Sequence, residues 1–405
     1  MMLQKIPLLV LLLLAGCSAP PTLPILVPPT TAVPVAPLVA SQWENLPGWP
    51  DADLQQSWKA FREGCRALKN KSAWQDVCAR GEQLADPDNA ALRSFFEQDF
   101  TPYQVNNPDG TTQGLVTGYY EPRLSGSRVR TEHFKHPLYA VPDDMLTIDM
   151  GELYPQLKGL RLRGRVEGKR VVPYYDRAAI DEAKAPLQGR ELFWVDDAVE
   201  LFFLQVQGSG RIELPDGTLV KVGYADQNGH PYNSIGRKLV ESGELKLEEA
   251  SMQGIKRWAE QNPQKLPALL AQNPSYVFFR ELPNSLSAPL GALGVPLTEA
   301  YSIAVDPRTV PLGAPVFLST TYPNSGEPLQ RLMLAQDTGG AIKGAVRADF
   351  FWGYGDEAGA MAGKMKQKGE MWVLLPKGME LPAPVPVAAQ PVAAAPVCVP
   401  AKNGQ

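Results

Sequence analysis

Apolar residues in the first third of the chain recur at roughly helical spacing. Two neighbouring segments show it, and their members are Leu54, Trp58, Phe61 and Leu68, then Trp74, Cys78 and Leu84. Residues spaced in this way share one face of an α-helix, so the pattern predicts two helices between Asp53 and Ala85. A third helix is expected from Ala90 to Phe100. We interpret all three as packing elements, because large apolar side chains are usually buried.

From Leu115 onward the pattern changes to short apolar runs separated by Gly, Pro or Asp, which is typical of strands. The strands expected in this central region are Leu115–Pro122, Leu138–Val141, Val171–Tyr175, Leu192–Val195, Leu201–Val206, Arg211–Leu214 and Thr218–Val222. The last two flank Pro215-Asp216-Gly217, which is a hairpin signal. The region is therefore expected to form a small antiparallel barrel or sandwich.

Helical spacing returns between Ser234 and Gln272, and strands resume after it. The later strands are expected at Tyr276–Phe279, Tyr301–Val305, Pro315–Leu318, Arg331–Gln336 and Met371–Leu375, with a short helix at Ala358–Gln367. The whole pattern predicts a mainly β protein with two strand-rich blocks and helical decoration.

Residues 1–16 have the features of a signal peptide. Lys5 precedes an apolar run from Ile6 to Leu14 that is too short to span a bilayer. The ending Leu14-Ala15-Gly16-Cys17 resembles a bacterial lipobox, in which Cys17 is lipidated; the alternative is an ordinary signal peptide with a chance cysteine. Ser18 at the next position resembles lipoproteins sorted to the outer membrane. We therefore expect a lipid-anchored protein of a Gram-negative outer membrane that faces the periplasm.

Two proline-rich segments border the part of the chain that is expected to fold. Residues 17–41 form the first, with seven prolines between Ser18 and Ser41, and residues 377–405 form the second, with six. Such segments favour extended conformations and cannot bury a core. The first is expected to act as a linker between the lipidated cysteine and the folded part, and the second as a disordered tail.

Composition excludes several classes of function. A net charge of −4 over 405 residues leaves no basic patch, so we expect no nucleic-acid partner. The three histidines, His133, His136 and His230, lack the spacing of a zinc site, so we expect no metal. Cys65 and Cys78 lie in neighbouring helical segments of a secreted protein, where a disulfide is plausible and two buried thiols are the alternative. Cys398 in the tail is left without a partner cysteine.

Carboxylates are thus the expected source of chemistry. Three aspartates follow or end predicted strands: Asp306, Asp337 and Asp349. Asp306 is expected to cap a turn before Arg308. Asp337 precedes Thr338-Gly339-Gly340, whose backbone N–H groups would lower its pKa and make it an orienting group. Asp349 precedes Phe350, Phe351 and Trp352, and shielding by these rings would raise its pKa toward that of a general acid; the alternative is a surface aspartate that ends a loop.

A glycine-containing turn, Gln207-Gly208-Ser209-Gly210, follows the strand expected at Leu201–Val206. It has two interpretations: a turn that lets a sugar approach and presents Gln207 and Ser209 as hydrogen-bonding groups, or a simple end of a strand. It lacks the third glycine of a dinucleotide-binding motif. Ser209 has no histidine nearby in sequence, so a hydrolase triad has little support.

Several separated motifs together resemble the membrane-bound lytic murein transglycosylase A (MltA) family. In chain order they are Thr117–Pro122, Phe202–Gly210, Gly223-Tyr224-Ala225, Asn228–Tyr232, Asn273–Phe279, Val305-Asp306-Pro307, Asp337–Gly344 and Asp349. The last three resemble the family's 3D region, named for three aspartates. The resemblance extends from about Trp43 to Pro376.

The resemblance implies a double-psi β-barrel domain formed by residues 42–122 and 275–376, with the 3D region at about 300–376. Residues 123–274 would form an inserted, smaller β-domain, and the glycan would lie in the groove between the two. Asp349 matches the family's single catalytic acid. The positions implied to bind substrate are Thr117, Gln207, Ser209, Asp337 and Lys343.

The implied activity is that of a lytic exotransglycosylase without a cofactor. It would cleave the β-1,4 bond between N-acetylmuramic acid and N-acetylglucosamine in peptidoglycan and leave a 1,6-anhydro sugar, with one aspartate as acid and then base. Two alternatives remain: a non-catalytic peptidoglycan-binding lipoprotein, and a hydrolytic glycosidase that pairs Asp349 with another carboxylate such as Asp337. The expected partners are glycan strands, the outer membrane and a wall-synthesis or division complex, and the protein is expected to be a monomer.

Overall fold

The computed structural model describes residues 36–157, 160 and 162–381. The predicted signal peptide, Cys17, most of the predicted linker and Cys398 lie outside the described residues. Among the residues that are described, no helix has both the length and the apolar character needed to cross a membrane.

Three α-helices lie between the short strand at Leu38–Ala40 and the rest of the sheet strands in the chain, as the apolar spacing predicts. They are α1 (Gln55–Leu68), α2 (Ser72–Gln83) and α3 (Asn89–Asp99), and Cys65 and Cys78 form a disulfide between the first two. Their buried rings pack edge to face, for example Trp58 on Phe95 at 5.1 Å between centroids. This aromatic layer is continuous with the apolar residues of a large sheet, so the helices cover part of the core.

The large sheet has eight strands, in the order β1-β2-β17-β14-β15-β13-β16-β3. Their bounds are β1 Leu38–Ala40, β2 Phe100–Val105, β17 Lys366–Pro376, β14 Pro315–Thr321, β15 Pro328–Asp337, β13 Ser302–Val305, β16 Arg347–Tyr354 and β3 Gly114–Glu121. Strand β17 also pairs with β3, and α9 (Gly355–Lys364) lies between β16 and β17 in the chain. Strands from both ends of the folded chain are therefore paired side by side.

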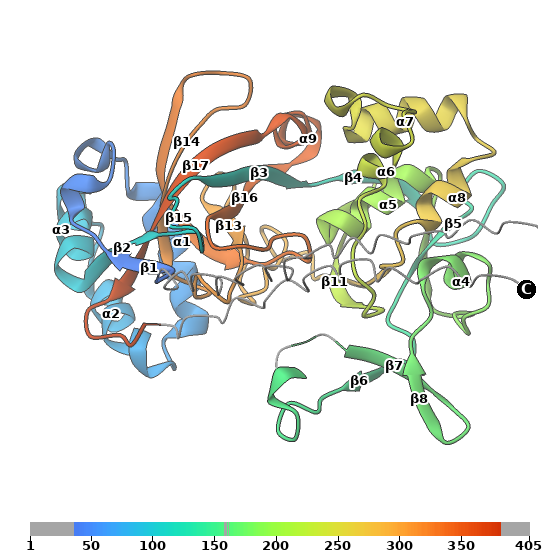
Figure 1. Ribbon diagram of the computed structural model, residues 1–405, viewed down its shortest axis with the longest axis horizontal. Coiled ribbons are helices and arrows are strands. Elements are labelled where there is room, and N and C mark those ends of the chain that lie inside the picture. The colour runs from blue at the N-terminus through green and yellow to red at the C-terminus, as the bar shows by residue number, and fades with distance from the viewer. Residues whose placement is uncertain (1–35, 158–159, 161, 382–405) are drawn as a thin grey trace, which may run out of the picture. The chain divides into compact units, whose positions relative to one another are not determined.

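A second sheet of six strands follows, in the order β12-β11-β10-β4-β9-β5. Its strands are β4 Arg123–Ser127, β5 His136–Tyr139, β9 Glu191–Val195, β10 Ser209–Glu213, β11 Leu219–Gln227 and β12 Val277–Glu281. Only Pro122 separates β3 from β4, so the chain passes directly from one sheet into the other (Figure 1). The end of β3 is consequently attached to both sheets.

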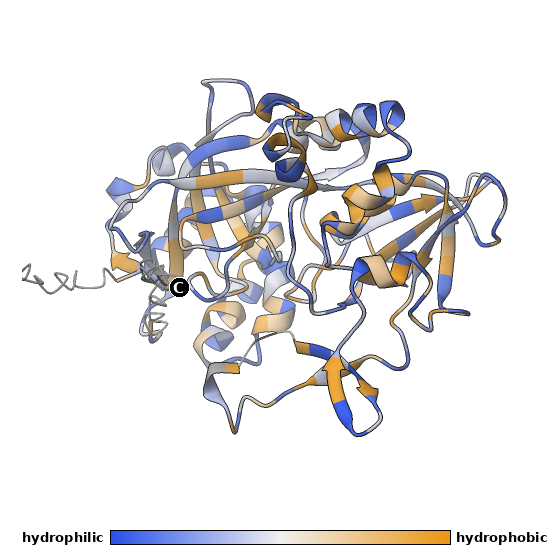
Figure 2. Ribbon diagram, turned by 45° about the vertical axis from the view of Figure 1, so that its right-hand side comes forward, coloured by the Kyte–Doolittle hydropathy of each residue, from blue (hydrophilic) through white to orange (hydrophobic). Residues whose placement is uncertain are grey.

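Helices and a small third sheet complete the chain. The helices are α4 Arg177–Asp181, α5 Ala198–Gln207, α6 Ile235–Glu241, α7 Met252–Gln261 and α8 Leu266–Ala271. The third sheet contains β6 (Leu146–Ile148), β7 (Leu162–Glu167) and β8 (Arg170–Pro173), in that order. Strand β7 alternates apolar and charged residues, whereas β8 contains two valines in succession, Val171 and Val172 (Figure 2).

The strand predicted at Leu201–Val206 is wrong, because these residues belong to helix α5. Leu201 and Leu204 pack against the six-stranded sheet, whereas Val199 and Phe202 pack against α6 and α7. A helix buried on two sides needs apolar residues all round, so its sequence lacks helical periodicity. Asp197 accepts hydrogen bonds from the N–H groups of Val199 and Glu200 at the start of the helix, and Gly208 ends it at φ 82°.

Candidate active site

Strands β3 and β16 run parallel in the large sheet and hold the predicted catalytic residue. Thr117 lies opposite Asp349, and Tyr119 lies opposite Phe351. Because side chains alternate along a strand, Thr117 and Tyr119 point to the same face of β3. Asp349 is the third residue of β16, so the expectation that it follows or ends a strand is wrong. Its place inside a paired strand fixes its backbone more firmly than a loop would.

A short chain of hydrogen bonds ends on the Asp349 carboxylate. Arg347 donates from Nη2 to the Thr117 hydroxyl oxygen (2.8 Å), and that hydroxyl donates to Asp349 Oδ1 (2.5 Å). Arg347 Nη1 is held by the carbonyl oxygens of Ala348 (2.5 Å) and Leu115 (3.3 Å). The guanidinium is therefore fixed to both strands before it reaches Thr117.

Asp349 has a perturbed acidity. Burial raises the pKa of its carboxyl above the ordinary value, while the Thr117 hydrogen bond and the positive charge of Arg347 oppose that rise. A carboxyl with a raised pKa retains its proton nearer to neutral pH, as a general acid requires.

Asp337 is the last residue of β15 and is hydrogen-bonded to Tyr119. Its Oδ1 accepts hydrogen bonds from the N–H groups of Ala292 (2.9 Å) and Thr338 (2.9 Å), and its Oδ2 accepts one from the Tyr119 hydroxyl (3.1 Å). Burial nevertheless raises the pKa of Asp337 to about 6, with a further contribution from the Asp349 charge. The expected lowering of this pKa is wrong, because desolvation outweighs all three hydrogen bonds. Of the two N–H donors, neither is a glycine of the following turn.

Tyr119 is hydrogen-bonded to Asp337 and lies close enough to Asp349 to be affected by its charge, and it was not singled out from the sequence. It is buried, and burial raises the pKa of its hydroxyl, with further contributions from the charges of Asp337 and Asp349. Its ring contacts Phe351 with centroids 5.1 Å apart. The sequence did contain a signal for Tyr119. Tyr119 follows Thr117 by two positions in a predicted strand, so its side chain lies on the same face as that of Thr117.

Gln207 and a buried ion pair attach the six-stranded sheet to the end of β3. Gln207, the last residue of α5, accepts a hydrogen bond at Oε1 from the Tyr120 N–H (3.1 Å). Arg211 donates from Nη2 to buried Glu121 (2.8 Å), and its guanidinium lies 3.6 Å from the ring centroid of Tyr354. These contacts position the start of the second sheet relative to β3 and β16.

The two remaining residues predicted to bind substrate, Ser209 and Lys343, do not contact the two aspartates. Ser209 is buried at the start of β10, opposite Gly223, and Lys343 is exposed in the segment between β15 and β16. Within residues 36–157, 160 and 162–381, no hydrogen bond or ion pair joins either residue to Asp337 or Asp349. The structure thus brings together Thr117, Asp337 and Asp349, and connects Gln207 to the same strand.

Asp306 has the structural role expected of it. It follows β13 and accepts hydrogen bonds from the backbone N–H of Arg308 (3.2 Å) and of Gly344 (3.0 Å), and its carboxylate pairs with the Arg308 guanidinium (2.5 Å). Burial favours a higher pKa, but these bonds outweigh it and hold the pKa of Asp306 below its ordinary value. Asp306 therefore supports the segment that precedes β16.

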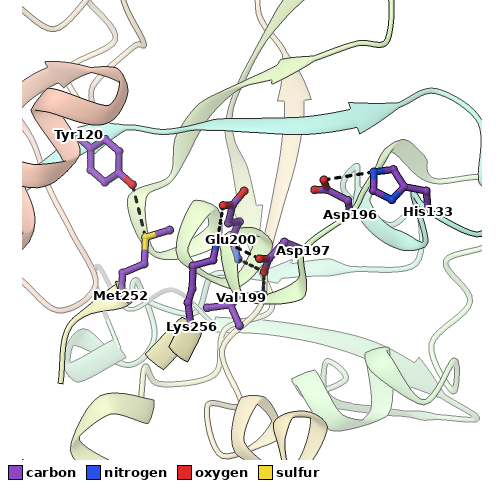
Figure 3. A network of polar contacts seen from close by, with 8 residues as sticks. All are labelled: Tyr120, His133, Asp196, Asp197, Val199, Glu200, Met252 and Lys256. Carbon is purple, nitrogen blue, oxygen red and sulfur yellow. Dashed lines mark hydrogen bonds and ion pairs between the residues drawn. The ribbon is translucent and has the colours of Figure 1, made fainter. Parts of the chain in front are cut away.

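The opposite face of β3 carries Tyr120, which borders a pocket of about 240 Å³. Its hydroxyl lies 3.6 Å from the Met252 sulfur (Figure 3). Lys256, which also lines the pocket, contacts Glu200 (2.5 Å) and Asp197 (3.1 Å), so its charge is already paired. Among the residues described, no group of three or more His, Cys, Asp or Glu side chains is placed to hold a metal ion.

Comparison with known proteins identifies the family. The model of the MltA specific insert domain matches residues 115–280, and that of the 3D domain matches residues 301–375. The membrane-bound lytic murein transglycosylase A of Escherichia coli (strain K12) is 34% identical over 297 residues, which are 72% of this chain and 72% of that protein.

Two crystal structures are similar over most of the chain. MltA from Neisseria gonorrhoeae, in a monoclinic form, has a TM-score of 0.74 and 44% identity, and the match covers 86% of this chain and 94% of that one. E. coli MltA with bound chitohexaose has a TM-score of 0.60 and 30% identity, with 79% and 90% covered. The mainly β fold, the ordered motifs and these matches agree, and the chain belongs to the MltA family of membrane-bound lytic murein transglycosylases.

Proposed function

We propose that this protein is a peptidoglycan lytic transglycosylase and that Asp349 is its catalytic acid. Family membership supports the activity, and the relative crystallised with chitohexaose supports a glycan substrate. The observation that carries the assignment of the acid is the hydrogen-bond chain from Arg347 through Thr117 to a partly buried carboxyl of raised pKa.

The direction of that chain decides which oxygen of Asp349 holds the proton. A guanidinium has only donors, so Arg347 must donate and the Thr117 oxygen must accept. The single hydroxyl hydrogen of Thr117 is then directed to Asp349 Oδ1, which is an acceptor. The transferable proton therefore resides on Oδ2, and Oδ2 is the atom that faces the scissile bond in this mechanism.

The reaction needs only this one carboxyl. Protonated Oδ2 donates to the glycosidic oxygen, and the bond from that oxygen to C1 of N-acetylmuramic acid breaks. The resulting carboxylate takes the proton from the O6 hydroxyl of the same muramyl residue, and O6 forms the new bond to C1. The product is a 1,6-anhydro ring, no water is consumed, and Asp349 is protonated again. An intramolecular nucleophile has the advantage of proximity.

The environment of Asp337 argues against a hydrolytic mechanism. A second carboxyl would have to activate a water or attack C1. Both oxygens of Asp337 already accept hydrogen bonds, Oδ1 from two backbone N–H groups and Oδ2 from Tyr119. We assign Asp337 to positioning, since a carboxylate held in this way has less freedom to act as a base or a nucleophile.

The finer features of fold and location belong to the same proposal. The large sheet would form a double-psi β-barrel from residues 42–122 and 275–376, and the insert, residues 123–274, would form the second wall of a groove that includes Gln207, Ser209 and Lys343. The direct passage from β3 to β4 supports this division. The lipobox-like ending at Cys17 supports an acylated anchor in the outer membrane, and the relatives' name, membrane-bound lytic murein transglycosylase A, agrees with membrane association.

Asp349→Asn tests the assignment. The variant should fold normally and release no 1,6-anhydro-muropeptides from purified sacculi, measured by mass spectrometry. Asp356→Asn is the matched control, because Asp356 follows the same strand with a side chain that is 93% exposed, and it should keep full activity. Activity retained in Asp349→Asn contradicts the catalytic role. Products from the unaltered protein that are heavier by one water would identify a hydrolase, and no products at all would identify a binding protein.

A further inference from the structure

Strand β3 lies between β16 and β17, so the face of the sheet that carries Asp349 continues onto β17 (Figure 1). Thr117 is paired with Asp349 on one side and with Lys366 on the other. Directly paired residues of neighbouring strands point to the same face of a sheet, so Lys366 shares the face of the proposed acid. Two strand spacings separate the Cα atoms of Asp349 and Lys366, which is roughly 10 Å.

A second row of paired residues runs beside the first. Leu115 is paired with Arg347 in β16 and with Lys368 in β17. Arg347 is bound to Thr117 and to backbone carbonyl oxygens, whereas Lys366 and Lys368 are both exposed. In the part of the chain that the structure describes, neither lysine ammonium group forms a hydrogen bond or an ion pair. Two positive charges on this face are therefore available to a ligand.

The acidic residues nearest in the chain do not neutralise these charges. Glu370, the next charged residue of β17 on the same face, is partly buried and accepts a hydrogen bond from the Thr112 hydroxyl (2.5 Å). Lys364, the last residue of α9, is a third exposed cation, and the acidic residues of that helix, Asp356 and Glu357, lie in its first turn. The segment from residue 364 to residue 368 thus carries three positive charges and no negative one.

A pocket of about 960 Å³ adjoins the lysines, and its opposite wall is formed by α6, α7 and the segment between them. Of the charged residues that line it, three are basic, Arg237, Lys364 and Lys366, and one is acidic, Glu248. Lys366 belongs both to this pocket and to the row of Asp349. An anionic group attached to a substrate at Asp349 therefore has a basic path across β3 and room at the end of it.

We propose that Lys366 and Lys368 bind carboxylates of the stem peptide of peptidoglycan and make peptide-bearing glycan a better substrate than bare glycan. This inference rests on the proposed function, which places the muramyl ring at Asp349. That ring carries the stem peptide on its lactyl group, so the peptide begins within one sugar ring of the bond that is cleaved. Stem peptides bear several carboxylates, and a lysine ammonium binds a carboxylate as a mobile point charge without requiring one fixed geometry.

Two forms of the same substrate test the proposal. Soluble peptide-bearing strands are compared with strands from which an amidase has removed the peptides, leaving only the lactyl carboxylate. The measured quantity is the ratio of kcat/KM for the two forms, from 1,6-anhydro ends counted by mass spectrometry. Lys366→Gln combined with Lys368→Gln should lower this ratio about three- to tenfold, because exposed ion pairs are individually weak. The loss should lie in KM for the peptide-bearing strands, and high salt should lower the ratio of the parent more than that of the variant.

Lys69→Gln combined with Lys71→Gln is the matched control, because it removes two exposed charges at the junction of α1 and α2. This variant should keep the ratio of the parent, and near-ultraviolet circular dichroism checks that both variants are folded. A ratio that the changes at Lys366 and Lys368 leave intact, or an equal fall in the control, would overturn the proposal.

The proposed function can fail separately from this inference. If the parent cleaves neither form of the strands, the transglycosylase assignment is contradicted, and calorimetric binding of the two forms then tests the lysines without catalysis. Preferential binding of peptide-bearing strands that is lost in the Lys366 and Lys368 variant supports the inference. Equal binding of the two forms overturns it.

Discussion

Replacing Thr117 with valine removes the one hydroxyl that donates to Asp349 while keeping the shape of the side chain. The hydrogen bond favours the carboxylate, so its loss should raise the pKa of Asp349 further. A hydrogen bond to a charged group contributes about 1.5–3 kcal/mol, and one pKa unit corresponds to about 1.36 kcal/mol. Because Asp349 is partly exposed, we take the lower end of this energy range and expect the pKa of Asp349 to rise by about one unit.

The direction of this change can be measured in the pH dependence of the reaction. In the proposed mechanism the active form of Asp349 is the protonated acid, so a higher pKa of this carboxyl keeps the enzyme active to higher pH. The alkaline limb of kcat/KM for release of anhydro-muropeptides should therefore move up by about one pH unit. The maximal rate should fall by about tenfold, because Oδ1 is no longer occupied and the proton is not confined to Oδ2.

Thr117→Ser is the matched control, because it retains the hydroxyl and should keep both the pH profile and most of the rate. Thermal unfolding checks that neither variant has lost its fold. A limb that stays in place in Thr117→Val, or that moves to lower pH, would refute the role assigned to this hydrogen bond.

Two further changes probe the surroundings of the site. The folded pKa of Asp337, about 6, exceeds its ordinary value of 3.8, so its contribution to stability is present below about pH 4 and is lost as the pH rises through 6. The stability of Asp337→Asn relative to the parent should therefore increase by on the order of 2 kcal/mol as the pH is raised from 4.5 to 7.5, measured by urea unfolding. A stability difference that does not change with pH would contradict this. A Cβ at Gly118 would lie 2.7 Å from Trp352 Nε1, so Gly118→Ala should lower the unfolding free energy by about 1–3 kcal/mol. The control is Gly340→Ala, because a Cβ at Gly340 would have nothing within 4 Å and should cause no clash. Equal losses of unfolding free energy in the two variants would contradict the packing argument.

Local sequence patterns were sufficient to predict a helix or strand where one of its faces is buried and the other is exposed. The spacing of Leu54, Trp58 and Phe61 predicted the first helix because only one side of α1 faces the core. The same reasoning failed for α5, which is buried on two sides and has a continuous apolar run. The capping aspartate Asp197 and the terminal Gly208 were the remaining local signals of a helix.

The sequence by itself located Asp349 and the family motifs, because these depend on the order and identity of residues. Only the tertiary structure decided what surrounds that carboxyl. Thr117 and Asp349 are separated by 232 positions, and only the pairing of β3 with β16 makes them neighbours. The pKa of Asp337 likewise depends on a balance between desolvation and hydrogen bonds that adjacent residues do not determine. Which face of β6–β7–β8 is exposed was also decided by a distant contact, that of Arg163 with Asp226. Alternation along a strand shows that two faces differ, but not which one the rest of the chain covers.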